Sequence, residues 1–208
     1  ITWRAVQLEI GSQDATDVRP AAASMLSAFY MPSRFSGDDT RAVASTICRE
    51  LNVPLTISSI DDAFEREAAA TREMLAAEPD AVTLQNIQAR IRGQRMWNWA
   101  NSSRGLFVQT SDMSEKAVGY TTIGGDLEGA ISVIANVPKT VVVAMLERLH
   151  ARFGFEGIAM CLQTKPGPEL AERQSAESEL MPFKVLDACL HFYAGEKLSP
   201  DHVGEALA

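Results

Sequence analysis

A short apolar segment at residues 105–109, Gly-Leu-Phe-Val-Gln, limits the possible fold of this chain more than any other feature. It predicts a buried strand that leads directly into a polar, glycine-containing run. Thr110 would then stand at the carboxyl end of the strand, where open α/β sheets bind ligands. Two carboxylates, Glu115 and Asp126, and the ammonium group of Lys139 follow it. Hydroxyl and ammonium groups suit phosphate, and carboxylates suit Mg²⁺ that is shared with substrate phosphates, so these residues indicate a nucleotide site.

Strand-like and helix-like segments alternate around this strand. Further strands are expected at 25–31 and 54–57, and helices at 36–51 with Ser36 as the cap, 61–77, 83–102 with Thr83 as the cap, 138–154 and 183–193. Residues 163–181 are polar and predict a long loop. Strands that alternate with helices indicate parallel β-α units. We therefore expect an α/β fold, a three-layer α/β/α sandwich with a mostly parallel sheet, in one domain over residues 1–208.

The composition excludes several classes of function. The formal net charge is −8, which argues against a protein that coats nucleic acid. The three cysteines are widely spaced and odd in number, which is typical of reduced thiols in a cytoplasmic protein. No apolar run approaches the roughly 18 residues of a membrane-spanning helix, and no signal peptide is visible. The chain begins at Ile1 rather than Met, as a part of a longer polypeptide would.

Short motifs between Phe29 and Ser199 are specific because of their order and spacing. They are Met-Pro-Ser-Arg-Phe-Ser at 31–36, Gln-Asn-Ile-Gln-Ala-Arg-Ile-Arg at 85–92, Thr-Ser-Asp-Met-Ser-Glu at 110–115, Val-Gly-Tyr at 118–120, Gly-Asp at 125–126, Pro-Lys-Thr at 138–140, Lys-Pro at 165–166 and Leu-Asp at 186–187. On these motifs the chain resembles the synthetase domain of NAD⁺ synthases. These are N-type ATP pyrophosphatases with a Rossmann-like, adenine nucleotide alpha hydrolase-like fold.

The resemblance implies a ligase that forms a C–N bond in two steps. The carboxylate of deamido-NAD attacks the α-phosphorus of ATP, which gives an adenylate and pyrophosphate. Ammonia, supplied directly or from glutamine, then displaces AMP and leaves the amide. The implied cofactor is Mg²⁺, with ATP as co-substrate, and the implied assembly is a homodimer or a higher homo-oligomer.

The resemblance also assigns roles at the phosphate end. Glu115 would hold Mg²⁺ or face the carboxyl end of deamido-NAD. Lys139 would contact the pyrophosphate leaving group. These two residues are the catalytic candidates. The alternative for Lys139 is a solvated side chain, and for Thr110 a hydroxyl that only completes a turn. Ser114 is expected to cap the helix that carries Glu115. The ATP-binding candidates are Met31, Ser33, Thr110, Lys139 and Lys165.

The deamido-NAD candidates are Asn86, Arg90, Glu115 and Asp126. Asn86 and Arg90 are four residues apart and so share one helical face. The resemblance implies that this face contacts deamido-NAD across a two-fold dimer interface. Asp126 either contacts the nicotinate end or closes a turn of its own loop.

The chain departs from the family in its phosphate-binding loop, because the motif Ser-Gly-Gly-x-Asp-Ser is absent. Its nearest counterpart is Gly-Ser-Gln-Asp-Ala at 11–15. Either the loop lies in a part of the protein outside this sequence, or the chain is a degenerate, non-catalytic homologue. The motif at 110–115 is closer to the glutamine-dependent form, in which an N-terminal glutaminase domain precedes the synthetase. GMP synthase and other amidotransferase-type ATP pyrophosphatases are further alternatives.

Overall fold

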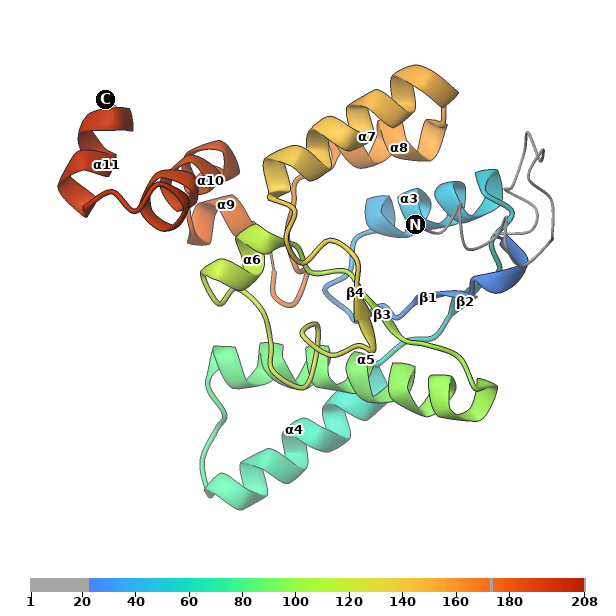
Figure 1. Ribbon diagram of the computed structural model, residues 1–208. Coiled ribbons are helices and arrows are strands. Elements are labelled where there is room, and N and C mark those ends of the chain that lie inside the picture. Colours follow the sequence, from blue (N-terminus) through green and yellow to red (C-terminus); the bar gives the residue numbers. More distant parts are fainter. Residues whose placement is uncertain (1–22, 173, 208) are drawn as a thin grey trace. The chain divides into compact units, whose positions relative to one another are not determined.

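The computed structural model describes residues 23–172 and 174–207 (Figure 1). The chain divides into two compact units: unit 1 comprises residues 1–59 and 146–164, and unit 2 residues 60–145 and 165–208. The described residues are mostly helical and contain two small sheets, each with two parallel strands. The expected parallel pairing is confirmed, while a three-layer sandwich in a single domain stays a prediction. None of the helices described is both long and apolar enough to cross a membrane. The 11–15 segment lies outside the described residues.

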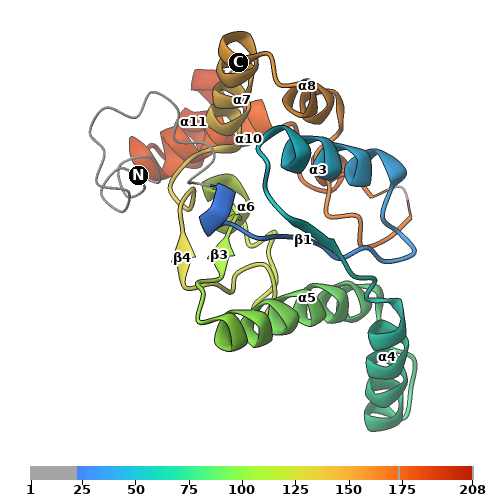
Figure 2. The same ribbon diagram turned by 90° about the vertical axis from the view of Figure 1, so that its right-hand side faces the viewer.

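Unit 1 contains a β-α-β arrangement of β1 (Ala28–Tyr30), α3 (Asp38–Glu50) and β2 (Leu55–Ile57) (Figure 2). The two strands are parallel, with Ala28 opposite Leu55 and Tyr30 opposite Ile57. Strand β1 is shorter than the expected 25–31 segment: residue 25 belongs to a short helical turn, and residues 26, 27 and 31 are irregular. The prediction that Ser36 caps α3 is wrong: Gly37 is the N-cap residue, and the Ser36 hydroxyl accepts a hydrogen bond from the Ser33 N–H instead.

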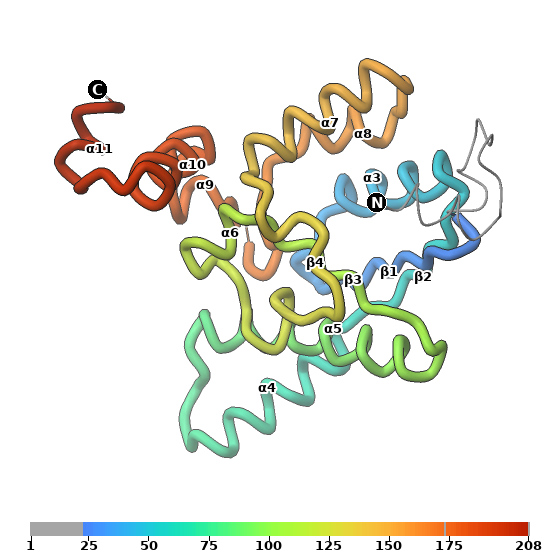
Figure 3. The backbone as a smooth tube through the Cα atoms, viewed as in Figure 1, coloured from blue at the N-terminus to red at the C-terminus, as the bar shows by residue number. Residues whose placement is uncertain are grey.

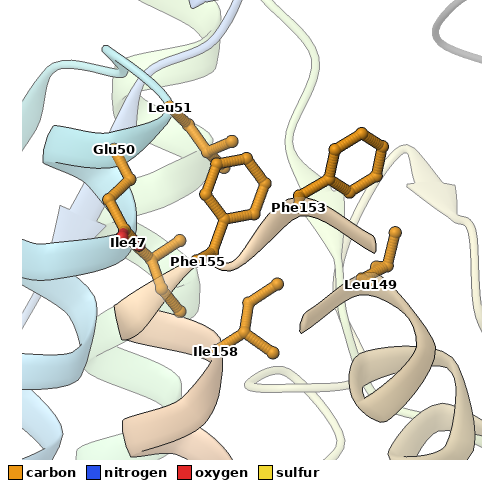
Figure 4. A pocket seen from close by; sticks show the side chains of 7 residues that line it. All are labelled: Ile47, Glu50, Leu51, Leu149, Phe153, Phe155 and Ile158. Atoms are coloured by element: carbon orange, nitrogen blue, oxygen red, sulfur yellow. The ribbon is translucent and has the colours of Figure 1, made fainter. Parts of the chain in front are cut away.

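Helix α8 (Glu156–Gln163) packs against α3 in the same unit. The Glu50 carboxylate accepts hydrogen bonds from the N–H groups of Glu156, at 2.7 Å, and Gly157, at 2.9 Å, which satisfies the first turn of α8. A hollow of about 210 Å³ lies beside this contact, and its lining contains none of the predicted site residues (Figure 4). The lining residues are Ile47, Glu50, Leu51, Leu149, Phe153, Phe155 and Ile158.

Unit 2 begins with α4 (Asp61–Leu75) and the long helix α5 (Ala81–Ser103). Thr83 does not cap α5 as predicted. Asp80 is the N-cap residue, and its carboxylate accepts a hydrogen bond from the Thr83 N–H at 2.7 Å. Asp has this effect because its short side chain reaches the N–H three residues ahead.

The middle of unit 2 contains β3 (Val108–Gln109), α6 (Met113–Ala117) and β4 (Ile131–Ser132), and the loop that leads from α6 to β4 runs along α5 (Figure 3). Strand β3 occupies only the end of the predicted 105–109 segment. The prediction that this segment is buried is wrong for its apolar residues Leu106 and Val108, which are exposed, while Gln109 is buried. Helix α7 (Lys139–Phe153) follows Pro138 and ends before Gly154, which has a φ of +69°, as expected for a glycine that terminates a helix. The boundary between the two units falls within α7, after Met145.

The end of unit 2 is helical: α9 (Ala176–Glu179), α10 (Phe183–Leu190), the π-helix η1 (His191–Gly195) and α11 (Pro200–Leu207). The predicted 163–181 loop is therefore shorter, since α9 lies within it. Phe183 and Leu186 of α10 are buried with Ala176 of α9 in one apolar cluster. This cluster buries the face of α10 that also carries Asp187.

Gly157→Ala should destabilise unit 1. A methyl group there would lie 2.5 Å from Ile47 Cγ1 and 2.7 Å from the Ile47 backbone nitrogen. We expect the free energy of unfolding, measured in urea, to fall by about 1–3 kcal/mol. The control is Gly204→Ala in α11, where a methyl group meets nothing within 4 Å. This control should instead be stabilising by about 0.5–1 kcal/mol, and equal effects of the two substitutions would contradict the close contact of α3 with α8.

Candidate functional site

A lysine held between two carboxylates forms the centre of the candidate site in unit 2. Lys139 Nζ lies 2.6 Å from Asp112 Oδ2 and 2.8 Å from Glu115 Oε1. The Asp112 side chain is only 1% exposed, and those of Lys139 and Glu115 are 17% and 25% exposed. Water and salt screen such pairs weakly, so the three side chains form one strongly coupled group. The sequence predicted Lys139 and Glu115 as site residues, and the structure brings them into contact.

The short helix α6 orients both carboxylates through a capping box. Asp112 Oδ1 accepts a hydrogen bond from the Glu115 N–H, and Glu115 Oε2 accepts one from the Asp112 N–H, each at 3.0 Å. One oxygen of each carboxylate is thus fixed on the backbone, while the other faces Lys139. The prediction that Ser114 caps this helix is wrong. Ser114 lies inside the first turn, is fully buried and donates its hydroxyl hydrogen to Asp187.

Lys139 is the first residue of α7, where a positive charge opposes the helix macrodipole. The two carboxylates of α6 compensate for this unfavourable position. The Phe183 ring adds a cation–π contact, with Nζ 5.3 Å from the ring centroid. The pyrophosphate leaving group was the predicted reason for a lysine at this position, and the structure supplies a second reason within the chain itself.

The charge of Lys139 is secure over the physiological pH range. Burial acts to lower the pKa of Lys139, but the hydrogen bonds and charges of Asp112 and Glu115 outweigh burial and raise that pKa above its ordinary value. The stability contributed by a group with a raised pKa is present below the unfolded pKa and is lost as the pH rises through the folded pKa. Lys139 therefore stays positively charged at neutral pH.

The predicted substrate face of α5 carries Asn86 and Arg90, and both contact the loop at residues 120–128. Asn86 Oδ1 accepts a hydrogen bond from Thr122 Oγ1 at 2.7 Å, and Arg90 Nε donates one to the Ile123 carbonyl at 3.1 Å. The prediction that these two residues share a helical face is confirmed. Their contact with deamido-NAD stays a prediction.

Glycine lets this loop lie directly on α5. A methyl group at Gly93 would lie 2.9 Å from the Gly124 carbonyl oxygen, and one at Gly125 would lie 2.8 Å from Ala89 Cβ. Any larger residue at either position would force the loop off the helix. At the far end of the loop, Trp97 Nε1 donates a hydrogen bond to the Glu128 carboxylate.

Asp126 ties the same loop together. Its Oδ1 accepts a hydrogen bond from the Thr122 N–H at 2.9 Å. Its backbone carbonyl accepts hydrogen bonds from Gln109 Nε2, at 2.7 Å, and Ser111 Oγ, at 2.8 Å. The structural role foreseen for Asp126, closing a turn, is therefore present. The exposed side chain can also reach a ligand, so the nicotinate contact stays a prediction.

The remaining ATP candidates lie in both units, and their binding roles stay predictions. Thr110 is exposed and lies between β3 and the capping box, and Lys165 is exposed in the segment after α8. In unit 1, Ser33 is buried and forms a turn, because its hydroxyl accepts a hydrogen bond from the Phe35 N–H at 3.3 Å. Met31 comes directly after β1.

Magnesium suits the chemistry of carboxylates, but the side chains described here do not by themselves form a magnesium site. Both oxygens of Glu115 are already bound, one to Lys139 and the other to the Asp112 N–H. Within residues 23–172 and 174–207, no group of three or more His, Cys, Asp or Glu side chains is placed to hold a metal ion. The assignment of Glu115 as a metal ligand therefore stays a prediction.

Sequence reasoning missed Asp112 and Asp187. Asp112 was detectable, because an Asp with a Glu three residues later is a capping-box pattern, and the box selects Asp112 over Ser114. Asp187 belongs to the Leu-Asp motif at 186–187, but nothing in the sequence indicated its role. It is 73 residues from Ser114 and 47 from Thr140, its hydrogen-bonding partners.

Comparisons with known proteins find NAD synthetases that are similar to this chain in sequence and in fold. A sequence model described as NAD synthase matches residues 12–207. A glutamine-dependent NAD(+) synthetase from Xanthomonas campestris pv. campestris is 31% identical over 179 residues, which cover 86% of this chain and 32% of that protein. The structure of a glutamine-dependent NAD(+) synthetase from Cytophaga hutchinsonii matches with a TM-score of 0.77 at 26% identity, over 97% of this chain and 34% of that chain. A glutamine-dependent NAD+ synthetase from Acinetobacter baumannii in complex with ADP matches with a TM-score of 0.65 at 23% identity, over 91% of this chain and 34% of that one.

The fold is thus that of the adenine nucleotide alpha hydrolases, with small parallel sheets among helices. The chain belongs to the NAD synthase family, and its relatives named above are glutamine-dependent NAD(+) synthetases. It spans about a third of the length of the curated relatives that it matches, and the match is to their synthetase portion. The predicted family is therefore confirmed.

Lys139→Met should be strongly destabilising, because it leaves the buried carboxylate of Asp112 without a compensating cation. We expect the free energy of unfolding to fall by about 3–5 kcal/mol in urea titrations. The double variant Lys139→Met/Asp112→Asn should recover much of this loss, since it removes the uncompensated charge. A loss below about 1 kcal/mol for the single variant, which is typical of a surface ion pair, would contradict the burial described here.

Proposed function

We propose that this chain is the synthetase part of an NAD⁺ synthase, a C–N ligase that uses ATP to amidate deamido-NAD. The observation that carries the proposal is the Lys139–Asp112–Glu115 group, in a chain that matches the family from residue 12 to residue 207. The structural relative with bound ADP supports an adenine nucleotide as the other ligand. Nitrogen would come from ammonia or, through a glutaminase domain, from glutamine.

The proposed chemistry has two steps. A carboxylate oxygen of deamido-NAD attacks the α-phosphorus of ATP, and the bond from that phosphorus to the bridging oxygen breaks, so that pyrophosphate leaves with the bonding electrons. Ammonia then attacks the activated carbonyl carbon, the bond from that carbon to the AMP oxygen breaks, and a proton is lost from nitrogen. Negative charge develops on pyrophosphate in the first step, and a fixed cation beside it lowers the barrier.

The side chains of unit 2 have separate tasks in this proposal. Lys139 supplies the cation, and Asp112 holds it in place. Glu115 holds the ammonium group from a second side and is the part of the group most open to solvent, so it is the carboxylate that a ligand or Mg²⁺ would meet. Thr110 would donate its hydroxyl hydrogen to a phosphate or to the adenylate. Magnesium, when bound with ATP, would neutralise part of the phosphate charge.

The deamido-NAD side would be formed by α5 and the loop at residues 120–128. Asn86 and Arg90 hold that loop, and the exposed carboxylate of Asp126 projects from it. Further ATP-binding residues in this proposal are Met31, Ser33 and Lys165. We also propose that the intact protein has a three-layer sandwich domain, that it is a cytoplasmic homodimer, and that a glutaminase domain precedes the synthetase.

A second candidate, a nucleotide-binding homologue without activity, is favoured by one observation. The sequence lacks Ser-Gly-Gly-x-Asp-Ser, whose backbone N–H groups would form a nest for pyrophosphate. The complete gene product, assayed for pyrophosphate release with ATP, deamido-NAD and ammonium, decides between the two. Release that depends on deamido-NAD supports the ligase. No release supports the inactive homologue, and release with GMP-pathway substrates alone would support a GMP synthase.

Glu115→Gln should abolish turnover without unfolding the protein. Glutamine serves in a capping box as well as glutamate, so α6 should persist, but the negative charge beside Lys139 is lost. We expect pyrophosphate release to fall at least about a hundredfold, with an unchanged circular dichroism spectrum. Glu196→Gln, at an exposed carboxylate directly after η1, is the matched control and should keep the full rate. Normal turnover of Glu115→Gln would show that the charge of Glu115 has no role in the reaction.

Arg90→Ala should raise the KM for deamido-NAD more than the KM for ATP. The substitution removes the hydrogen bond to Ile123 and so frees the loop on the proposed deamido-NAD side. Arg72→Ala on α4, where the guanidinium group pairs with Glu78 at the surface, is the control for loss of an arginine. An equal rise of both KM values for Arg90→Ala would argue against its substrate role.

A further inference from the structure

Asp187 of α10 has a buried carboxylate to which the proposed reaction assigns no task. It is connected to Lys139 through hydrogen bonds to Ser114 and Thr140. It is 9% exposed and lies on the packed face of α10 with Phe183 and Leu186. Its Oδ2 accepts hydrogen bonds from the Thr140 N–H, at 2.8 Å, and from Thr140 Oγ1, at 2.7 Å. Its Oδ1 accepts the hydrogen of the Ser114 hydroxyl.

These contacts replace the cap that α7 lacks in its own sequence. The first N–H groups of a helix have no partner within the helix, and Pro138, which precedes α7, has no side-chain acceptor to offer them. The Lys139 N–H donates to Ser114 Oγ at 2.8 Å, and the Thr140 N–H donates to Asp187. The cap of α7 is therefore built from two other helices, α6 and α10.

The same contacts fix the distance between the two halves of the candidate site. Ser114 is the neighbour of Glu115 on α6, and Thr140 is the neighbour of Lys139 on α7. Asp187 is bound to both Ser114 and Thr140, so it clamps α6 to the start of α7. Its negative charge also lies at the positive end of α7, where it offsets the unfavourable position of the Lys139 cation.

We propose that Asp187 is a positioning residue, which through Ser114 and Thr140 holds the Lys139 ammonium group at its place beside Asp112 and Glu115. The proposal rests on the proposed function for its effect on catalysis, but not for its effect on Lys139. Asp187 does not touch substrate. It acts by keeping a cation where charge develops, and a displacement of about 1 Å there is enough to lower a rate a hundredfold.

The first test measures Lys139 itself and needs no activity. The complete gene product is treated with formaldehyde and a borane, and the methylation rate of each lysine is followed by mass spectrometry. Lys139 should react slowly in the wild-type protein, because its ammonium group is paired and little exposed. In Asp187→Asn it should react several-fold faster, while the exposed Lys165 keeps its rate. An unchanged rate at Lys139 would overturn the proposal.

The matched control is Glu50→Gln in unit 1. Glu50 also caps a helix of another segment through two backbone N–H groups, so this variant loses a comparable capping charge away from Lys139. Both variants should show lower thermal stability. Only Asp187→Asn should increase the labelling of Lys139. An equal increase in Glu50→Gln would show that lower stability in general exposes Lys139, and would overturn the positioning role of Asp187.

The second test uses pyrophosphate release and includes a double-mutant cycle. Asp187→Asn should lower kcat by about 10- to 100-fold with little change in either KM. Combined with Lys139→Met it should cause no further loss of kcat, because the cation that it positions is gone. Additive losses would overturn the proposal. Thr140→Val, which keeps the N–H but removes the hydroxyl donor, should give a smaller fall in kcat and provides a milder variant if Lys139→Met does not fold.

The two tests also separate this proposal from the proposed function. If the wild-type protein releases no pyrophosphate, the ligase function fails, and the labelling result alone decides the role of Asp187. If the wild-type protein is active and Asp187→Asn changes neither labelling nor kcat, the positioning role fails while the ligase function stands.

Discussion

The ammonium group of Lys139, held between the carboxylates of Asp112 and Glu115, is the charge around which the described part of unit 2 is organised. A buried carboxylate without a partner would be costly, and so would a lysine at a helix N-terminus. The Lys139 ammonium group and the Asp112 carboxylate compensate for each other, but only if the start of α7 stays at a fixed distance from α6. The capping box of α6 and the side chain of Asp187 both act on that separation. Stability and the proposed catalysis therefore depend on the same few atoms.

Much of the architecture was predictable because its causes are local. The apolar segments before Pro32 and before Thr110 gave strands, and the end of α7 at Gly154 followed from the freedom of glycine to adopt a positive φ. The shared face of Asn86 and Arg90 followed from helical periodicity alone. The family followed from the order of several short motifs, and its confirmation along residues 12–207 shows that this order was specific.

The errors have physical reasons of two kinds. At α5 and α6 the wrong residue was chosen as the cap, because Thr83 and Ser114 are good capping residues that are overruled by an Asp two or three positions earlier. At Asp187 the cause is distance along the chain: its partners are decided by how α10 packs, and no local pattern encodes that packing. Both reasons apply to Asp112. Its capping role could have been predicted from the local sequence, but its ion pair with Lys139 could not, because Lys139 lies on another helix.

A structure of the intact protein with pyrophosphate or a non-hydrolysable ATP analogue would show whether Lys139 meets the phosphates. We expect a phosphate oxygen within about 3 Å of Lys139 Nζ, with the ammonium group still in contact with at least one carboxylate of α6. If the phosphates lie away from Lys139 and the Lys139–Asp112–Glu115 group is unchanged, these two ion pairs serve stability alone and the proposed role of Lys139 is wrong.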